Sequence, residues 1–130
     1  MTKAVTWKGY FAYAGGYPAS PEPVMHGRLI VQEDGLVFQQ RRGFWRRLQY
    51  QFTIPYSEMC EVAQQTCPGG LFGPDHFVEI VVRDHAGPHT VRFKSIGVSV
   101  EKNAWKLCAL LNSLIEVRGV DRAGPHRGEQ

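Results

Sequence analysis

The feature that most constrains this fold is a change of hydrophobic period close to residue 99. Before that point, short β-prone runs alternate apolar and polar residues and are separated by glycine, proline and aspartate. Beyond it, apolar residues recur at the 3.6-residue spacing of an α-helix. The pattern predicts strands at residues 7–13, 26–32, 36–40, 50–54, 59–65, 77–83 and 90–94, and a helix at residues 99–118.

The hairpin predicted between residues 77 and 94 has the clearest alternation. One of its faces is apolar and is expected to enter the core; it consists of Val78, Ile80, Val82, Val91 and Phe93. An earlier hairpin is predicted at Asp34-Gly35, because both residues tolerate the positive φ of a type I′ turn. That turn would place Val31 opposite Phe38 on one face of the sheet.

The predicted helix has one apolar stripe, flanked by Cys108, that is expected to pack on the sheet. The stripe consists of Val100, Ala104, Leu107, Leu111, Leu114 and Ile115. Ser99 is placed to cap the start of the helix, and Gly119 is placed to end it. Residues 119–130 are polar and are expected to form a flexible tail, which leaves residues 1–118 as a single domain.

Seven short antiparallel strands followed by one helix predict a mainly β fold. Such strands avoid long open edges by closing into a barrel or by folding into a sandwich. One amphipathic helix must cover an apolar surface, and the open corner of the sheet is a natural place for it. We therefore expect a seven-stranded barrel or orthogonal sandwich, capped by a C-terminal helix.

Composition excludes several classes of protein. A chain of 130 residues with 43% hydrophobic and 21% charged residues has the make-up of an ordinary globular domain. Three cysteines are too few for a secreted disulfide scaffold, and no segment approaches the ~20 apolar residues of a membrane-spanning helix. The N-terminal residues lack the apolar run of a signal peptide. A soluble, cytoplasmic protein is expected.

Two stretches of the sequence, GRLIVQEDGLVF at residues 27–38 and FTIPYSEMCEV at residues 52–62, carry a family resemblance. The first resembles the second and third strands of the pleckstrin-homology superfold, and in particular of its GRAM-like and bacterial members. The second resembles the fourth strand of that fold running into the fifth. The resemblance covers residues 7–118.

What the resemblance implies is a binding or scaffolding domain without catalytic activity, at a membrane surface or in a protein assembly. In the family, three loops form the ligand end, and here they correspond to residues 15–25, 41–48 and 84–89. Phosphoinositide-binding members carry a lysine and then a basic-x-arginine run near the first two strands. The run here is His26-Gly27-Arg28, without a lysine in the first loop. Arg28 is therefore a candidate ligand residue, while inositol-phosphate recognition is not implied.

The sharpest local motif is a basic and aromatic segment at residues 41–47. Its candidate ligand- or membrane-binding residues are Arg41, Arg42, Phe44, Trp45, Arg46 and Arg47. Arginine pairs bidentately with phosphates, and an aromatic tip can sit among lipid headgroups or stack on bases. An alternative interpretation is a solvated hairpin loop in which Trp45 folds back onto the sheet. Between the two, the sequence favours an anionic-surface contact.

Candidate protein-interface residues lie elsewhere in the chain. Trp105 falls outside the apolar stripe of the helix, and Leu71 and Phe72 lie in a glycine-rich loop that could present them to a partner. For Trp105 the sequence favours the other interpretation, in which it packs on the N-terminal strand or on a loop. The partner is thus expected to be an anionic lipid surface or a protein, and homo-oligomerisation remains open.

Other chemistry finds no supporting motif. The five histidines and the cysteines lack the spacing of a metal site, and no nucleophile has a base and an orienting group beside it. The glycine-rich loop lacks the lysine of a phosphate-binding loop. No cofactor, metal or enzymatic activity is expected, and nucleic acid is the weakest candidate partner because no extended basic face is evident.

Overall fold

A computed structural model describes all residues except 1–4, 21, 43–44, 46, 71–72 and 124–130. Its elements are β1 (Val5–Tyr13), β2 (Val24–Gln32), β3 (Gly35–Arg42), β4 (Arg47–Pro55), the short 3₁₀ helix η1 (Tyr56–Glu58), β5 (Met59–Gly70), β6 (Gly73–Asp84), β7 (Gly87–Ser95) and α1 (Val100–Ala123). The strands form one antiparallel sheet in the order β4-β3-β2-β1-β7-β6-β5. The expectation of a mainly β fold with one C-terminal helix is confirmed.

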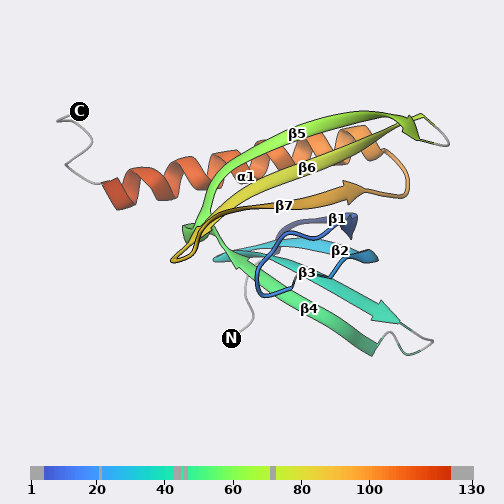
Figure 1. Cartoon of the computed structure of the whole chain (residues 1–130), viewed down its shortest axis with the longest axis horizontal. Helices are drawn as coiled ribbons and strands as arrows, with labels where there is room; N and C mark the ends of the chain where they lie inside the picture. Colours follow the sequence, from blue (N-terminus) through green and yellow to red (C-terminus); the bar gives the residue numbers. More distant parts are fainter. Residues whose placement is uncertain (1–4, 21, 43–44, 46, 71–72, 124–130) are drawn as a thin grey trace.

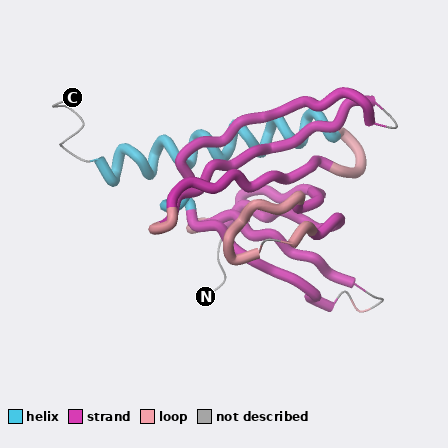
Figure 2. Tube along the Cα trace, viewed as in Figure 1, coloured by secondary structure: helices cyan, strands magenta, loops and turns pink. Residues whose placement is uncertain are grey.

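The sheet folds over at the junction between β1 and β7. This ladder is short, with Phe11 opposite Ser95 and Tyr13 opposite Phe93. Strands β1–β4 and β5–β7 thus form two layers, and α1 runs along the β5–β7 half (Figures 1 and 2). Within the described residues β4 does not pair with β5, so the sheet stays open rather than closing into a barrel.

The strand alternation determines which side chains enter the core. The predicted inner face of the last hairpin is confirmed, since all five of its apolar residues are buried. Three residues of the helix stripe are also buried, namely Ala104, Leu107 and Leu111. These helix residues cover the β5–β7 half, while the opposite half supplies Phe11, Tyr13, Leu29, Val31, Leu36, Phe38, Phe52 and Ile54.

The predicted turn at Asp34-Gly35 is wrong in type and register. Val31 pairs with Leu36 rather than with Phe38, and φ at Gly35 is not positive. A Cβ at Gly35 would lie 2.8 Å from Thr53 Cγ2, so glycine is needed for close approach to β4 and not for a turn. The register differs from the expected one by two residues. Because side chains alternate with a period of two, the same residues still face the core.

The helix continues past its predicted end. Gly119 was expected to stop it, but α1 extends to Ala123, so residues 119–123 belong to the helix rather than to a tail. A helical glycine is less favourable than alanine by only about 1 kcal/mol, which an established helix can absorb. The first proline after it is Pro125, which lies outside the described residues. At the start of α1, the Ser99 carbonyl accepts a hydrogen bond from the Asn103 amide.

Two tyrosines attach the β1–β2 connection to the core. The buried Tyr13 hydroxyl accepts a hydrogen bond from the Tyr17 amide at 2.8 Å and donates one to the Ser20 carbonyl. The Tyr17 ring stacks on Phe52 of β4 at 5.3 Å, and its hydroxyl lies 3.1 Å from Glu58 in η1. Tyr17 therefore bridges the place where the sheet passes from β4 towards β5 without strand pairing.

This arrangement predicts a loss of stability in alkali. Burial and the neighbouring Glu58 carboxylate raise the pKa of Tyr17 to about 12. The unfolded chain releases this proton at a pH of about 10, so the folded state holds it more tightly. The stabilisation is complete below pH of about 10 and disappears as the pH rises towards about 12. Urea titrations should show a shallower decline over that range for Tyr17→Phe than for wild type. Tyr10→Phe, a change at an exposed ring, serves as the control, and identical slopes for all three proteins would contradict the assignment.

Candidate functional site

The outer face of the β1–β4 half carries a cross-strand row of polar and aromatic side chains. Tyr10 pairs with Arg28, Arg28 with Gln39, and Gln39 with Gln51. The row follows from the inner-face pattern, because the residues between buried ones must point outward. The Arg28 guanidinium lies 5.9 Å from the centroid of the Tyr10 ring, and Gln39 donates a 2.8 Å hydrogen bond to Gln51.

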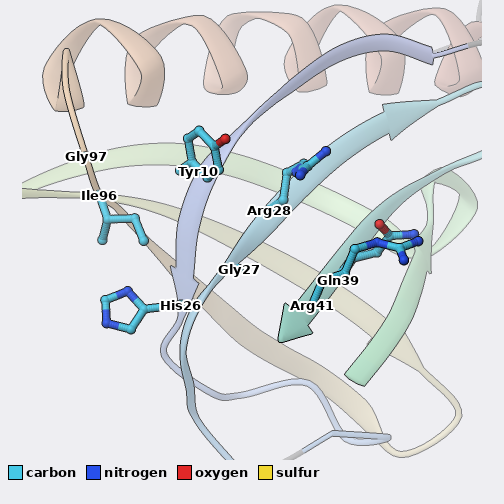
Figure 3. Close-up of a pocket in the computed structure, with 8 residues that line it drawn as sticks. All are labelled: Tyr10, His26, Gly27, Arg28, Gln39, Arg41, Ile96 and Gly97. Atoms are coloured by element: carbon cyan, nitrogen blue, oxygen red, sulfur yellow. The ribbon is translucent and has the colours of Figure 1, made fainter. Parts of the chain in front are cut away.

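A shallow cleft of about 440 Å³ opens at the β1 end of this row. It is lined by Tyr10, His26, Gly27, Arg28, Gln39, Arg41, Ile96 and Gly97. Tyr10, Arg28 and Arg41 stand on three neighbouring strands, and Ile96 and Gly97 lie on the connection into α1 (Figure 3). The cleft thus combines two guanidiniums and an imidazole with an aromatic and an aliphatic wall. Such a lining suits a ligand with an anionic group.

Arg41 connects this cleft to the end of the β3–β4 hairpin. Arg41, Arg42 and Arg47 are exposed, and Trp45 is 80% exposed, so its ring is not folded back onto the sheet. Phe44 and Arg46, also predicted as binding residues, lie outside the described residues. The hairpin end and the cleft therefore share Arg41, and the hairpin end carries exposed arginines on both sides of the exposed Trp45 in the sequence.

Charge is divided unevenly along the chain. Residues 1–57 contain seven lysines and arginines and three acidic residues, whereas residues 58–130 contain eight and nine. In the second part, Arg92 pairs with Glu79 at 2.8 Å and Lys94 with Asp75 at 3.5 Å. By contrast, Arg28, Arg42 and Arg47 form no ion pair with any described residue. The cations around the cleft and hairpin end thus leave a net positive surface.

The third loop expected at the ligand end lies elsewhere. The β6–β7 turn and the end of the β3–β4 hairpin lie at opposite sides of the molecule (Figure 1). The groups of the β6–β7 turn also bond to one another, since Asp84 accepts hydrogen bonds from the Ala86 amide at 2.8 Å and from His89 at 3.2 Å. These bonds, the Ala86 amide first, lower the pKa of the Asp84 carboxyl. Residues 84–89 do not contribute to the cleft.

Trp105 is 63% exposed on α1, so most of its ring is accessible rather than packed on the N-terminal strand. It borders a second, more open hollow with Pro74 and His76. Leu71 and Phe72, the other predicted interface residues, lie outside the described residues. Trp105 therefore stays apart from the basic surface and marks a different face of the molecule.

Sequence reasoning predicted Arg28 and Arg41 as site residues and missed the six other residues of the cleft: Tyr10, His26, Gly27, Gln39, Ile96 and Gly97. For those on strands, the only signal in the sequence was that they alternate with apolar residues expected in the core and so point outward. That alternation does not reveal which outward residues of separate strands are neighbours. Ile96 could not be found at all, because its place depends on how the connection after β7 returns past β1, where its amide bonds to the Tyr10 carbonyl at 3.2 Å.

No protein-family model matches this sequence, and comparison with curated proteins finds no significant match. In the described part of the chain, no helix combines the length and apolar character needed to cross a bilayer. Among the same residues, no three histidine, cysteine or acidic side chains gather in a way that could hold a metal ion.

Gly27 is predicted to be essential for the floor of the cleft. A Cβ there would lie 2.3 Å from Cζ of Phe38 and 2.8 Å from the Gln39 carbonyl oxygen. Overpacking of this kind costs about 1–3 kcal/mol, so Gly27→Ala should lower the free energy of unfolding by that amount. In a Phe38→Leu background, where the ring is gone, the same substitution should be less destabilising. Equal losses in both backgrounds would contradict this steric explanation.

Proposed function

We propose that this chain is a non-catalytic binding domain of the pleckstrin-homology type that attaches to anionic membrane surfaces. The observation that carries the proposal is that the basic cleft and the exposed, tryptophan-bearing end of the β3–β4 hairpin share Arg41. The strand order, with one helix after seven antiparallel strands, supports the family likeness inferred from residues 27–38 and 52–62.

In the proposed mechanism, long-range attraction comes from the cations and short-range attachment comes from the indole. A basic residue near an anionic bilayer contributes about 1 kcal/mol, and this attraction is screened by salt. Trp45 enters the headgroup region, where its ring buries apolar area while the indole N–H stays hydrated. The cleft beside it accepts one anionic headgroup between Arg28 and Arg41, with Tyr10 as its wall. Attachment of this kind is peripheral and takes place at a cytoplasmic membrane face.

A second candidate function is protein–protein interaction through α1. The observation that favours it is the 63% exposure of Trp105 beside the hollow at the start of the helix. A large aromatic side chain kept in solvent is a common anchor of protein interfaces. This surface lies outside the basic region, so the two functions can be separated by substitution.

The charge prediction compares two variants of equal net charge. Arg42→Ser with Arg47→Ser removes two cations from the hairpin end, and Arg83→Ser with Lys106→Ser removes two exposed cations elsewhere. Co-sedimentation with vesicles of phosphatidylcholine and phosphatidylserine should weaken about thirtyfold for the first variant, which corresponds to about 2 kcal/mol. The second variant should bind nearly as wild type does. Equal weakening of both would mean that only net charge matters and would remove the hairpin end from the mechanism.

Substitution of Trp45 tests whether its indole inserts into the bilayer or whether binding is electrostatic alone. Partial burial of an indole contributes about 1–2 kcal/mol, so Trp45→Ala should bind the same vesicles about tenfold more weakly. Trp105→Ala, the matched loss of an exposed indole, should bind normally and keep the blue shift of fluorescence on vesicle addition. If Trp105→Ala loses binding while Trp45→Ala does not, the face of α1 is the contact and the second candidate function is favoured.

A further inference from the structure

The open sheet has two edge strands, β4 and β5, and β5 is the better protected from pairing with another chain. On α1, the Asn112 side chain donates a 3.2 Å hydrogen bond to the backbone carbonyl of Val62 in β5, and the Cys108 thiol lies 3.8 Å from the same oxygen. The β5 strand is also irregular, with a register shift after Cys67 and a proline at position 68. These are features by which proteins protect a sheet edge from further pairing.

The edge of β4 has far less protection. β4 pairs with β3 on one side, and no described strand or helix pairs with its other side (Figure 1). Residues 50–54, YQFTI, contain no charge, proline or glycine and pair with β3 in an unbroken register. The register shift of the β3–β4 ladder lies before them, between the pairs Gln40–Tyr50 and Arg41–Leu48. An unguarded edge of this kind readily accepts another extended chain.

The direction of the free backbone groups follows from two observations. The Tyr56 amide donates to the Asp34 carbonyl, which makes the neighbouring pair Gly35–Pro55 a non-hydrogen-bonded pair. Proline has no N–H, in agreement with that position. The orientation of backbone groups alternates along a strand. Thr53 and Gln51, two and four residues before Pro55, therefore direct their N–H and C=O groups away from β3. The Thr53 carbonyl meets the Tyr17 hydroxyl at 3.4 Å, which leaves the Thr53 amide and both groups of Gln51 facing outward.

The charge around the β4 edge determines which kind of extended segment fits there. Arg42 and Arg47 are exposed at the end of β4 that begins the strand, whereas the acidic Glu58 lies beyond the other end of β4, 3.1 Å from the Tyr17 hydroxyl. A second copy of the chain would bring together two basic halves. An extended segment with acidic residues would instead meet backbone donors and acceptors along β4 and cations at its end.

We propose that the open edge of β4 is a docking site for an extended, acidic segment of a partner protein, which adds to the sheet as an eighth strand. Both backbone groups of Gln51 and the Thr53 amide hold the segment by ladder hydrogen bonds, and Arg42 and Arg47 select its acidic residues. This site shares Arg42 and Arg47 with the membrane contact, but its ladder hydrogen bonds use main-chain groups in the middle of β4 rather than the indole or the cleft.

The test uses a peptide in which alternating threonine and valine residues stand between two pairs of glutamates, so that either strand direction places acids beside the arginines. Titration into the full chain, followed by amide NMR shifts and hydrogen exchange, should protect the Gln51 and Thr53 amides. A peptide with lysine in place of glutamate should bind at least about tenfold more weakly. N-methylation of alternate peptide amides should abolish the protection, because it removes the ladder donors.

Two variants at one position isolate the main-chain contribution. Gln51→Pro removes an outward N–H without breaking the β3–β4 ladder and should lose peptide binding, whereas Gln51→Thr keeps that N–H and should bind as wild type does. Both should keep the dispersed amide spectrum of the folded wild type, so that a loss of peptide binding reports on the β4 edge and not on unfolding. The proposal is overturned if the acidic peptide leaves both amides unprotected, or if binding survives N-methylation or Gln51→Pro. A dimer that forms with wild type and not with Gln51→Pro would also overturn it, since a second copy would then occupy the edge.

Discussion

A cluster of aromatic rings at the centre of the folded sheet is the contact on which the other features depend. The Tyr13 ring lies 4.8 Å from Phe52 and 5.4 Å from Phe93, and Phe38 lies 6.0 Å from Phe93. These rings come from β1, β3, β4 and β7, so they hold the two halves of the sheet together where strand pairing between them is short. Burying such side chains contributes about 1.5–3 kcal/mol each. The Tyr13 hydroxyl extends the same cluster into the β1–β2 connection.

The surface features follow from this inner face. With Phe11, Leu29 and Phe38 inside, Tyr10, Arg28 and Gln39 must point outward at neighbouring positions, and a row of potential ligand contacts results. The open sheet has a second consequence. Where β4 and β5 do not pair, Tyr17 fills the inner side of the gap and bonds to the Thr53 carbonyl, but the backbone groups of Gln51 face outward.

The two proposed contacts share the basic end of β4 but depend on different atoms. Membrane attachment relies on side chains of the hairpin end and the cleft, while strand addition relies on main-chain groups near Gln51. Because Arg42 and Arg47 serve both, a membrane-bound molecule would have fewer cations available for an acidic partner. Binding at the two proposed surfaces would then be mutually weakening.

The sequence by itself determined the element order, the inner residues and the uneven placement of charge, because alternation of period two and the switch to 3.6 are local properties of the chain. It misplaced the turn at Asp34 and the helix end at Gly119, where tight packing against β4 and the low penalty for one glycine outweighed local preference. The tertiary structure alone decided that the sheet stays open, that Ile96 passes beside Tyr10, and that Arg28 and Arg41 share a cleft. These relations join residues far apart in the chain, and only the packing of the two halves sets them.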